Sequence, residues 1–324
     1  MAKLGVDPDN IRTFYDDRYN NGYMREHKGI DPYRVKSVLR EIPIDAKNVL
    51  DYGCGQGGWT ETLSKKFPEA DLCGIDISAR AVELARKRYP GHRFFVFDGA
   101  TTPFEENSFD FIYSYHVLEH VSDIERSVSN ISRLLKKGGY LCIVLPCGNK
   151  GSFEEMVTRL IRDGKEPSID GRERFFYEDI GHIRRLKSDE LIELFARHGV
   201  KPYKEFYAYQ FWGAVEWISK SGFDFVRDIF DHKKSVSLSA KARLLLLREI
   251  FMILAADMKL YTTKLLSHVR SDEKISRRMA AAALIPFKML LVPFGYAIDL
   301  FSFMEWRFRR TARNGSAQYL IFKK

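Results

Sequence analysis

The segment that begins at Asp51 holds the residue types best suited to ligand chemistry. Asp51 is followed by Gly53, Gly55, Gly57 and Gly58 in the run Asp-Tyr-Gly-Cys-Gly-Gln-Gly-Gly. Glycines let the backbone turn tightly and let a ligand approach where no Cβ stands in the way. Three of these glycines also satisfy the G-x-G-x-x-G pattern of dinucleotide sites, which by itself is weak evidence.

Three carboxylates distinguish the candidate cofactors. Asp51 would be unfavourable beside a pyrophosphate but suits a ligand with an ammonium and a sulfonium charge, which favours S-adenosylmethionine over NAD. Asp76, in Gly-Ile-Asp-Ile-Ser, stands where a carboxylate accepts both ribose hydroxyls of either cofactor. Asp98 could accept from the adenine amino group while the N–H of Gly99 or the next alanine donates to a ring nitrogen.

These residues need a scaffold that brings the ends of separate segments together. Short apolar runs alternate with helical patterns, which predicts βαβ units and a parallel sheet covered on both faces. The expected strands are 48–51, 71–75, 93–97, 109–113 and 140–145, and the expected helices are 59–66, 79–88 and 124–135. Ligands of such sheets bind beyond the carboxyl ends of the strands, where the three carboxylates lie.

Two further strands are expected after this region. A capped helix at 188–198 precedes a strand at 200–209, and the alternating run 317–322 predicts a strand that pairs with the edge offered by 200–209. The residues between them then form a long helical insertion. We therefore expect one domain of residues 1–210 plus 316–324 and an insertion of residues 211–315.

Five motifs in order resemble the class I S-adenosylmethionine-dependent methyltransferases. The fourth motif, residues 108–121, is most similar to the ubiquinone/menaquinone-biosynthesis subgroup and its relatives in sugar and natural-product pathways. The motifs are 49–57, 74–78, 97–100, 108–121 and 134–140, and the resemblance covers roughly residues 33 to 209 plus the final strand.

The resemblance implies a fold and a set of cofactor contacts. The fold is a doubly wound, mostly parallel, Rossmann-like sheet of seven strands with the last strand antiparallel. The implied contacts are Asp51 and Gly53 near the methionine moiety, Asp76 on the ribose, Ile77 against the adenine face and Asp98 on the adenine amino group. Gly55, Gly57, Gly99 and Tyr115 complete the expected cofactor-binding residues.

Histidines are the candidates for the chemical step. Methyl transfer from a sulfonium is a direct displacement, so a base is needed only where the acceptor must lose a proton. His116 and His120 would share one face if residues 117–121 were helical, and His120 is the first choice as base or substrate orienter. His182 could also reach the acceptor. A purely structural role for His120 is an equal alternative.

Two segments are candidate lids. Tyr15, Tyr19 and Tyr23 lie in an aromatic cluster similar to the lid of related enzymes, although their four-residue spacing fits ordinary packing of a helix on the core equally well. The charged stretch 148–181 is the second candidate.

Composition and charge limit the possible partners. With 45% hydrophobic residues and only four cysteines, the chain is neither a fibrous protein nor one held together by disulfides. The cysteines have no C-x-x-C spacing, so we expect buried, reduced thiols and no metal site. The net charge of +9 is concentrated in the insertion, which has 18 Lys and Arg against 10 Asp and Glu. Residues 1–210 carry about −1.

The insertion is apolar as well as basic. Residues 279–298 contain one charge, Lys288, and approach the ~20 apolar residues of a spanning helix, but Pro286 and Pro293 would interrupt it. We therefore expect a bent or re-entrant pair that dips into one leaflet, with Phe301, Phe303 and Trp306 at interfacial depth and residues 241–310 on an anionic membrane.

The expected function is O-methylation of a lipid, a lipid-linked glycan or another membrane-associated acceptor. The first alternative is a soluble sugar or natural product, with the insertion capping the pocket or forming a homodimer; the second is a non-catalytic cofactor-binding scaffold. Nucleic acid is disfavoured because Tyr113-Ser-Tyr-His116 replaces the Asp/Asn-Pro-Pro-Tyr/Phe run of many N-methyltransferases. The first ten residues lack a signal-like apolar stretch, so we expect a cytoplasmic protein peripheral on the inner face of the cytoplasmic membrane.

Overall fold

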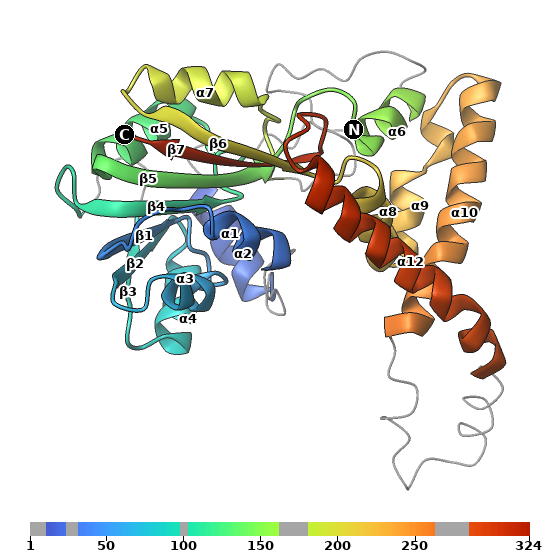
Figure 1. The fold of residues 1–324 in the computed structure, drawn as a ribbon, viewed down its shortest axis with the longest axis horizontal. Coiled ribbons are helices and arrows are strands. Elements are labelled where there is room, and N and C mark those ends of the chain that lie inside the picture. Colours follow the sequence, from blue (N-terminus) through green and yellow to red (C-terminus); the bar gives the residue numbers. More distant parts are fainter. Residues whose placement is uncertain (1–10, 24–31, 98–102, 162–180, 263–284) are drawn as a thin grey trace, which may run out of the picture.

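A seven-stranded sheet organises the computed structural model, which describes residues 11–23, 32–97, 103–161, 181–262 and 285–324. The strand order is β3-β2-β1-β4-β5-β7-β6 (Figure 1). The strands are β1 Asn48–Tyr52, β2 Asp71–Asp76, β3 Arg93–Val96, β4 Phe109–Tyr115, β5 Leu135–Pro146, β6 Lys201–Ala208 and β7 Ala317–Lys323. Strands β1 to β5 pair in parallel, and β7 is antiparallel to both of its neighbours. The predicted fold class is confirmed.

The last strand lies inside the sheet and not at its edge. β7 pairs with β5 along Tyr140–Pro146 and with β6 along Lys201–Ala208. The predicted pairing of the last strand with the strand at 200–209 is confirmed; β7 also pairs with β5, so β6 is the edge strand. Leu320, Ile321 and Phe322 are at most 1% exposed, which shows why an interior position suits this apolar run.

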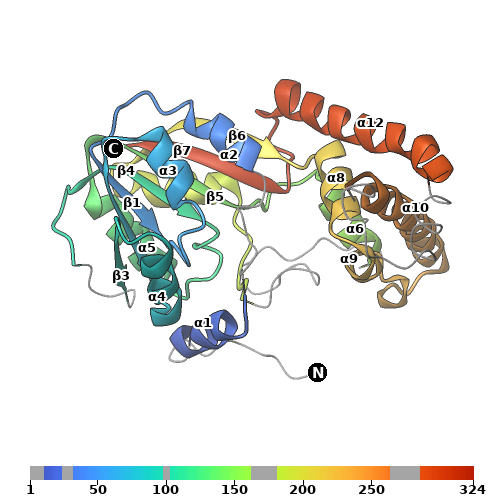
Figure 2. The same ribbon diagram turned by 90° about the horizontal axis from the view of Figure 1, so that it is seen from below.

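Helices cover both faces of the sheet (Figure 2). One face packs against α5 Ile124–Leu134 and α7 Ser188–Ala196. The other packs against α2 Pro32–Leu39 and α3 Thr60–Lys66, and α4 Ala79–Arg88 covers β2 and β3. All four cysteines are free and buried, as predicted.

The residues between β6 and β7 form the expected helical insertion. It contains α8 Trp212–Lys220, α9 Phe223–Ile229, the short η2 His232–Lys234, α10 Leu238–Thr262 and α12 Ile285–Arg309. These helices share an apolar core with α6 Phe153–Ile161, which precedes them by about 50 residues in the chain. The insertion is thus packed around a helix contributed by the β5–α7 connection.

Helix α12 docks the insertion onto the sheet through its C-terminal part. Glu305 accepts hydrogen bonds from the backbone N–H groups of Phe211, Trp212 and Gly213 at the start of α8, at 2.8 to 3.0 Å. A carboxylate at a helix N-terminus is electrostatically favourable. Trp306 is 2% exposed and its ring lies 5.6 Å from the Tyr319 ring. Its expected interfacial depth is therefore wrong, because it is part of the core under the sheet.

The apolar segment of the insertion also differs from expectation. α12 is one helix that runs through Pro293, and Pro286 is its second residue, where a missing N–H is tolerated. The prolines therefore do not interrupt it. Among the described residues no helix is both long and apolar enough to cross a membrane. Phe301 and Phe303, in contrast to Trp306, are exposed by 41% and 47%.

Candidate active site

The glycine loop after β1 is held against β2. The N–H groups of Gly53 and Cys54 both donate to the Ile75 carbonyl, at 2.8 and 2.9 Å. Gly53 has φ +81°, and a Cβ there would lie 2.2 Å from Cγ2 of Val117. Only glycine fits this position, because both the backbone conformation and the space exclude a side chain. The loop is therefore clamped between β2 and the turn after β4.

Asp76 faces the glycine loop from the end of β2. Its Oδ2 accepts from Gly55 N–H at 2.8 Å and its Oδ1 from Ser78 N–H at 2.9 Å. Burial raises the pKa of this carboxyl, although both hydrogen bonds act in the opposite direction. Asp76 and Ile77 both line the cavity described below. The predicted contacts of Asp76 with the ribose and of Ile77 with the adenine are compatible with these positions.

Asp51 is a buried carboxylate that forms no ion pair with another residue in the part of the chain that the structure describes. It is 1% exposed, and its Oδ2 has no hydrogen-bond partner among the described residues. Burial, with the nearby charge of Asp76, raises its pKa to about 8. Its chain neighbours Tyr52 and Gly53 line the cavity, whereas Asp51 itself does not. A cationic ligand near this carboxylate would favour its ionised form, which fits the ammonium of S-adenosylmethionine.

The remaining predicted cofactor residues occupy different positions. Tyr115 and Gly55 line the cavity. Gly57 does not; a Cβ there would lie 2.9 Å from the Tyr89 ring, so its φ of +79° serves the turn and this packing. Asp98 and Gly99 lie outside the described residues.

One cavity of about 510 Å³ joins these residues to the insertion. At one end it contacts the glycine loop, and at the other it reaches Trp217 of α8 and Phe225 of α9. Trp59, Val144 and Tyr319 also line it. None of Trp59, Val144, Trp217, Phe225 and Tyr319 was predicted as a site residue, because their common position depends on how distant elements pack.

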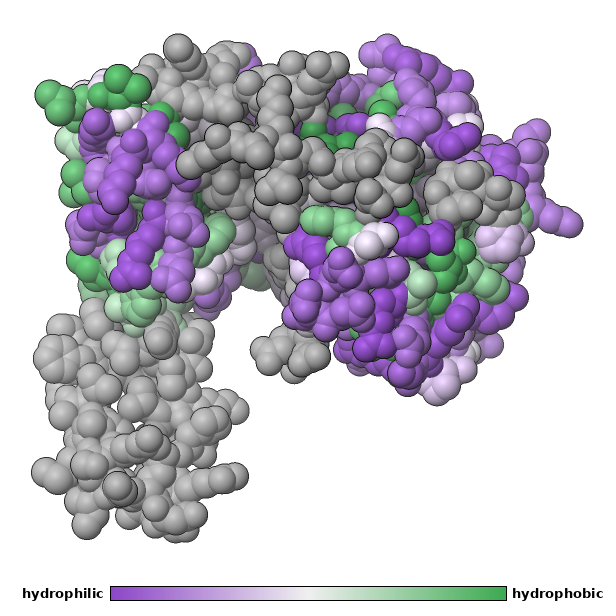
Figure 3. Space-filling model, turned by 180° about the vertical axis from the view of Figure 1, so that it is seen from behind, coloured by the Kyte–Doolittle hydropathy of each residue, from purple (hydrophilic) through white to green (hydrophobic). Residues whose placement is uncertain are grey.

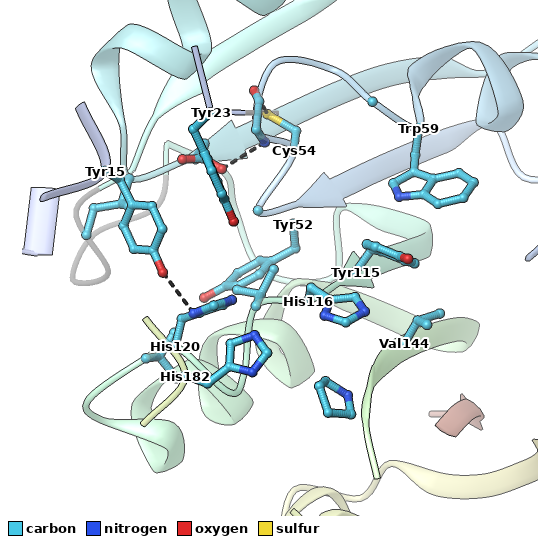
Figure 4. Close-up of a pocket in the computed structure, with 18 of the residues that line it drawn as sticks. Tyr15, Tyr23, Tyr52, Cys54, Trp59, Tyr115, His116, His120, Val144 and His182 are labelled. Atoms are coloured by element: carbon cyan, nitrogen blue, oxygen red, sulfur yellow. Dashed lines mark hydrogen bonds between the residues drawn. The ribbon is translucent and has the colours of Figure 1, made fainter. Parts of the chain in front are cut away.

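Three histidines of the cavity wall, His116, His120 and His182, lie close together (Figure 4), and all three approach one buried carboxylate, that of Glu119. His116 Nδ1 lies 2.8 Å from Oε1 of Glu119, and the Nε2 atoms of His120 and His182 each lie 3.9 Å from the same oxygen. The rings of His120 and His182 are 4.7 Å apart. The structure therefore brings the three predicted catalytic histidines together.

Glu119 is the site residue that the sequence analysis missed. Its side chain is fully buried, and the three surrounding imidazoles lower its pKa to about 2 despite the opposing effect of burial. Glu119 follows His116 by three residues and directly precedes His120, and this spacing could have identified it in the sequence. For His120, burial is the main cause of a pKa lowered to about 4.

The histidines sit on a turn and not on a helix. His116 has φ +53°, and the N–H of His120 donates to the Val117 carbonyl at 2.9 Å. The conditional prediction of a helix at 117–121 is therefore wrong, although the turn still places both rings in the cavity. A turn reverses the chain within a few residues and so can aim His116 and His120 at one point.

Two residues that follow His182, Ile183 and Arg184, are hydrogen-bonded to this turn. Arg184 donates to the carbonyls of Leu118, Val121 and Ser122, at 3.2 Å for Leu118 and 3.0 Å for Ser122. The N–H of Ile183 donates to the Glu119 carbonyl at 3.0 Å. These bonds hold His182 against a turn that is more than 60 residues away in the chain.

Helix α1 Ile11–Asn20 covers the cofactor end of the cavity. Asp16 Oδ1 accepts from Ser78 Oγ at 2.6 Å and from Arg80 N–H at 3.0 Å, which attaches the helix to the start of α4. Tyr15, Tyr19 and Tyr23 all line the cavity, and no residue of α1 is buried. Of the two interpretations of the tyrosines, the geometry supports the lid.

Comparison with known proteins agrees with this geometry. Residues 50–143 match a family model described as a methyltransferase domain. The chain is 31% identical over 171 residues to a trans-aconitate 2-methyltransferase of Variovorax paradoxus, covering 52% of this chain and 62% of that protein. It is 30% identical over 149 residues to a ubiquinone biosynthesis O-methyltransferase of Coxiella burnetii, covering 44% and 63%. The match thus spans less than two thirds of either relative.

Solved structures support the fold. The [4+2]-cyclase SpnF aligns with a TM-score of 0.52 at 14% identity, over 98% of this chain and 96% of that one. Phosphoethanolamine N-methyltransferase 2 of Haemonchus contortus, solved with S-adenosyl-L-methionine, aligns with a TM-score of 0.51 at 16% identity, over 100% and 61%. Residues 50–143 are thus similar to a methyltransferase domain, and the chain has the fold that these two solved structures share, one of which was solved with S-adenosyl-L-methionine.

Proposed function

We propose that the protein transfers the methyl group of S-adenosylmethionine to a hydroxyl oxygen of a largely apolar acceptor bound between the sheet and the helical insertion. One observation carries the proposal: a single cavity connects the glycine loop, the histidine cluster and the aromatic residues Trp217 and Phe225 of the insertion. The donor and the acceptor of a displacement need such a shared, water-excluding space.

Different residues of the chain bind the methyl donor, exclude water and accept the proton. The glycine loop, Asp76 and Asp51 hold the donor, and Tyr15 and Tyr19 of α1 exclude water from it. The histidine cluster receives the acceptor hydroxyl, and His120 takes its proton as the O–CH₃ bond forms and the S–CH₃ bond breaks. His120 is fixed for this role by Tyr15, whose hydroxyl lies 2.8 Å from Nδ1.

The apolar character of the acceptor is inferred from the far end of the cavity. Its lining there is mainly aromatic, and the cation in it, Arg185, is already engaged. Arg185 donates to the carbonyls of Cys147 and Ser316, at 2.7 and 3.0 Å, and pairs with Glu154 at 3.3 Å. A guanidinium bound in this way is poorly suited to a polyanion such as the tricarboxylate named for one relative.

Trp217→Ala provides the test of this acceptor site. The purified protein is supplied with labelled S-adenosylmethionine and a panel of hydroxylated aromatic and isoprenoid compounds. For a compound that is methylated, Trp217→Ala should raise KM several-fold and leave the cofactor Kd unchanged. Trp212→Ala, on the same helix but outside the cavity lining, is the matched control. Equal effects of the two variants would contradict the proposal.

A membrane-resident acceptor is a second candidate, favoured by the exposed face of α12. This face is apolar and is followed by the exposed Arg307 and Arg309. Its exposed large side chains are Phe294, Tyr296, Leu300, Phe301, Phe303, Met304 and Phe308. Figure 3, which views the opposite side of the molecule from Figure 1, shows further hydrophobic side chains along the outer edge of the insertion, on the left of that view. Apolar side chains beside arginines suit the interface of an anionic bilayer, with the protein peripheral to it.

Flotation with vesicles tests this second candidate. The full chain should float with vesicles that contain an anionic lipid and less with neutral ones, and Phe301→Ser with Phe308→Ser should reduce flotation. Light scattering of the same variants measures the alternative use of this face as a homodimer contact. A dimer that the variants dissociate, with no flotation of the parent, would reject the membrane candidate.

A further inference from the structure

We propose that His116, Glu119 and His182 form a binding site for one divalent transition-metal ion in the wall of the cavity. One donor atom from each lies within 4.8 Å of the other two. The binding of the ion stands on these residues alone, whereas its catalytic use rests on the proposed O-methylation. No metal site was expected from the sequence, because the four cysteines lack C-x-x-C spacing.

The charge of Glu119 is the first argument for an ion. Its carboxylate is 0% exposed, and the ion pairs that it makes among the described residues are all with imidazoles. The nearby Arg184 directs its guanidinium to the carbonyls of the turn. A buried carboxylate is costly without a compensating positive charge. A divalent ion between Glu119 and the imidazoles would supply that charge.

The donor set indicates the class of metal. Two imidazole nitrogens and one carboxylate oxygen are the ligands of zinc sites and of facial-triad iron sites, whereas magnesium and calcium prefer oxygen ligands alone. Zn²⁺, Fe²⁺ and Mn²⁺ are therefore the candidates, and Co²⁺ is a suitable spectroscopic probe.

The backbone around the three residues is held in a defined conformation by specific hydrogen bonds. His116 is held in a left-handed conformation, which costs energy in a residue with a side chain. The segment that carries His182 is fastened to the turn through Ile183 and Arg184. Outer hydrogen bonds of this kind orient metal ligands. The two segments thus converge by specific bonds and not by a chance approach of surface loops.

The position of the cluster explains what the ion would do. His116 and His182 line the cavity, while Glu119 lies behind them. A metal ion held by these residues would lie beside the acceptor space and would lower the pKa of a hydroxyl bound to it. The proton would pass to His120 as the oxygen attacks the methyl carbon, and the sulfonium would leave as a neutral thioether. No oxidation or reduction of the metal takes place.

Cobalt titration is the direct test. Full-length protein without a histidine tag is treated with a chelator, dialysed and titrated with Co²⁺ while visible absorption is recorded, and Zn²⁺ affinity is measured by competition with a fluorescent chelator. One ion should bind per chain. Glu119→Gln and His182→Ala should each weaken binding by more than the roughly 10- to 100-fold that outer-sphere changes cost. His198→Ala, outside the cavity lining, should bind as the parent does.

Calorimetry of S-adenosylmethionine binding on the same samples shows whether a variant that loses metal binding is still folded. Variants that bind S-adenosylmethionine with the parent's affinity are folded, so weakened metal binding in them supports the site. A parent protein that binds the cofactor but no Co²⁺ or Zn²⁺ would overturn the metal site and leave O-methylation intact. Methyl transfer that survives chelation would overturn the catalytic use of the ion. Stoichiometric metal binding without transfer to any hydroxyl acceptor would keep the site and reject the function.

Discussion

The hydroxyl of Tyr15 lies 2.8 Å from Nδ1 of His120, and this contact joins the N-terminal helix α1 to the turn after β4. The two residues are 105 positions apart in the chain. Their rings meet edge to face at 5.8 Å. The helix that covers the cofactor end of the cavity is therefore also the element that orients a histidine of the proposed reaction.

Tyr15→Phe should lower kcat by about 2- to 10-fold, the effect of losing one neutral hydrogen bond. The cofactor Kd should change little, since the phenyl ring still covers the cavity. Steady-state kinetics and calorimetry measure the two quantities. Tyr33→Phe, which alters a tyrosine that is 48% exposed, is the matched control. A kcat equal to that of the parent would show that the contact does not orient His120 for transfer.

Asp76→Asn should weaken S-adenosylmethionine binding by at least about 10-fold. The substitution removes charge-assisted hydrogen bonds to the ribose, each worth about 1.5 to 3 kcal/mol, and weakens the bond to Gly55 N–H. Isothermal calorimetry measures the Kd. Asp71→Asn, at the exposed start of the same strand, should leave it unchanged. Unaltered binding in Asp76→Asn would remove this carboxylate from the cofactor site.

The raised pKa of Asp51 predicts that cofactor binding is coupled to the release of a proton. Its pKa of about 8 means that the carboxyl is mostly protonated at pH 7 in the free protein. An ammonium group beside it favours the ionised form, so binding should release up to one proton. Affinity should then rise with pH and level off above about pH 8. Calorimetry at pH 7 in buffers of different ionisation enthalpy counts the protons.

Asp51→Asn is the control for this linkage, because the amide has the same shape and does not titrate. The variant should bind more weakly, with an enthalpy that no longer depends on the buffer. If the parent itself shows no buffer dependence, the ammonium is held elsewhere and the assignment of Asp51 fails.

Gly53→Ala should destabilise the protein by at least about 2 kcal/mol. A left-handed backbone is unfavourable for alanine, and the new Cβ would lie 2.2 Å from Val117 Cγ2. Gly58→Ala is the matched control in the same loop, since a Cβ there meets nothing within 4 Å. Thermal unfolding of both variants measures the difference. Equal midpoints would mean that the loop relaxes at no cost.

Glu305→Gln should loosen the insertion without unfolding the sheet. The amide loses the charge that favours the N-terminus of α8 and can accept fewer of its three N–H groups. Hydrogen exchange should quicken at residues 211–213 and stay unchanged in β1 and β4. Parent-like protection of these amides would contradict the docking role of Glu305.

The sequence alone determined the sheet and the cofactor end of the site. The strand limits follow from local hydrophobic runs, and Asp76 and the glycine loop are adjacent to them in the chain. These features depend on residues within one βαβ unit, whose handedness and ligand edge follow general rules. The same local logic explains why the three histidines were identified as residues that do chemistry.

Only the tertiary structure decided how the distant parts meet. The interior place of β7, the burial of Trp306 and the joining of α6 to the insertion all depend on packing between segments far apart in the chain. Glu119 shows the physical reason most clearly. Its importance comes from complete burial beside His182, 63 positions away, and burial is a property of the folded chain that no local pattern of residues encodes.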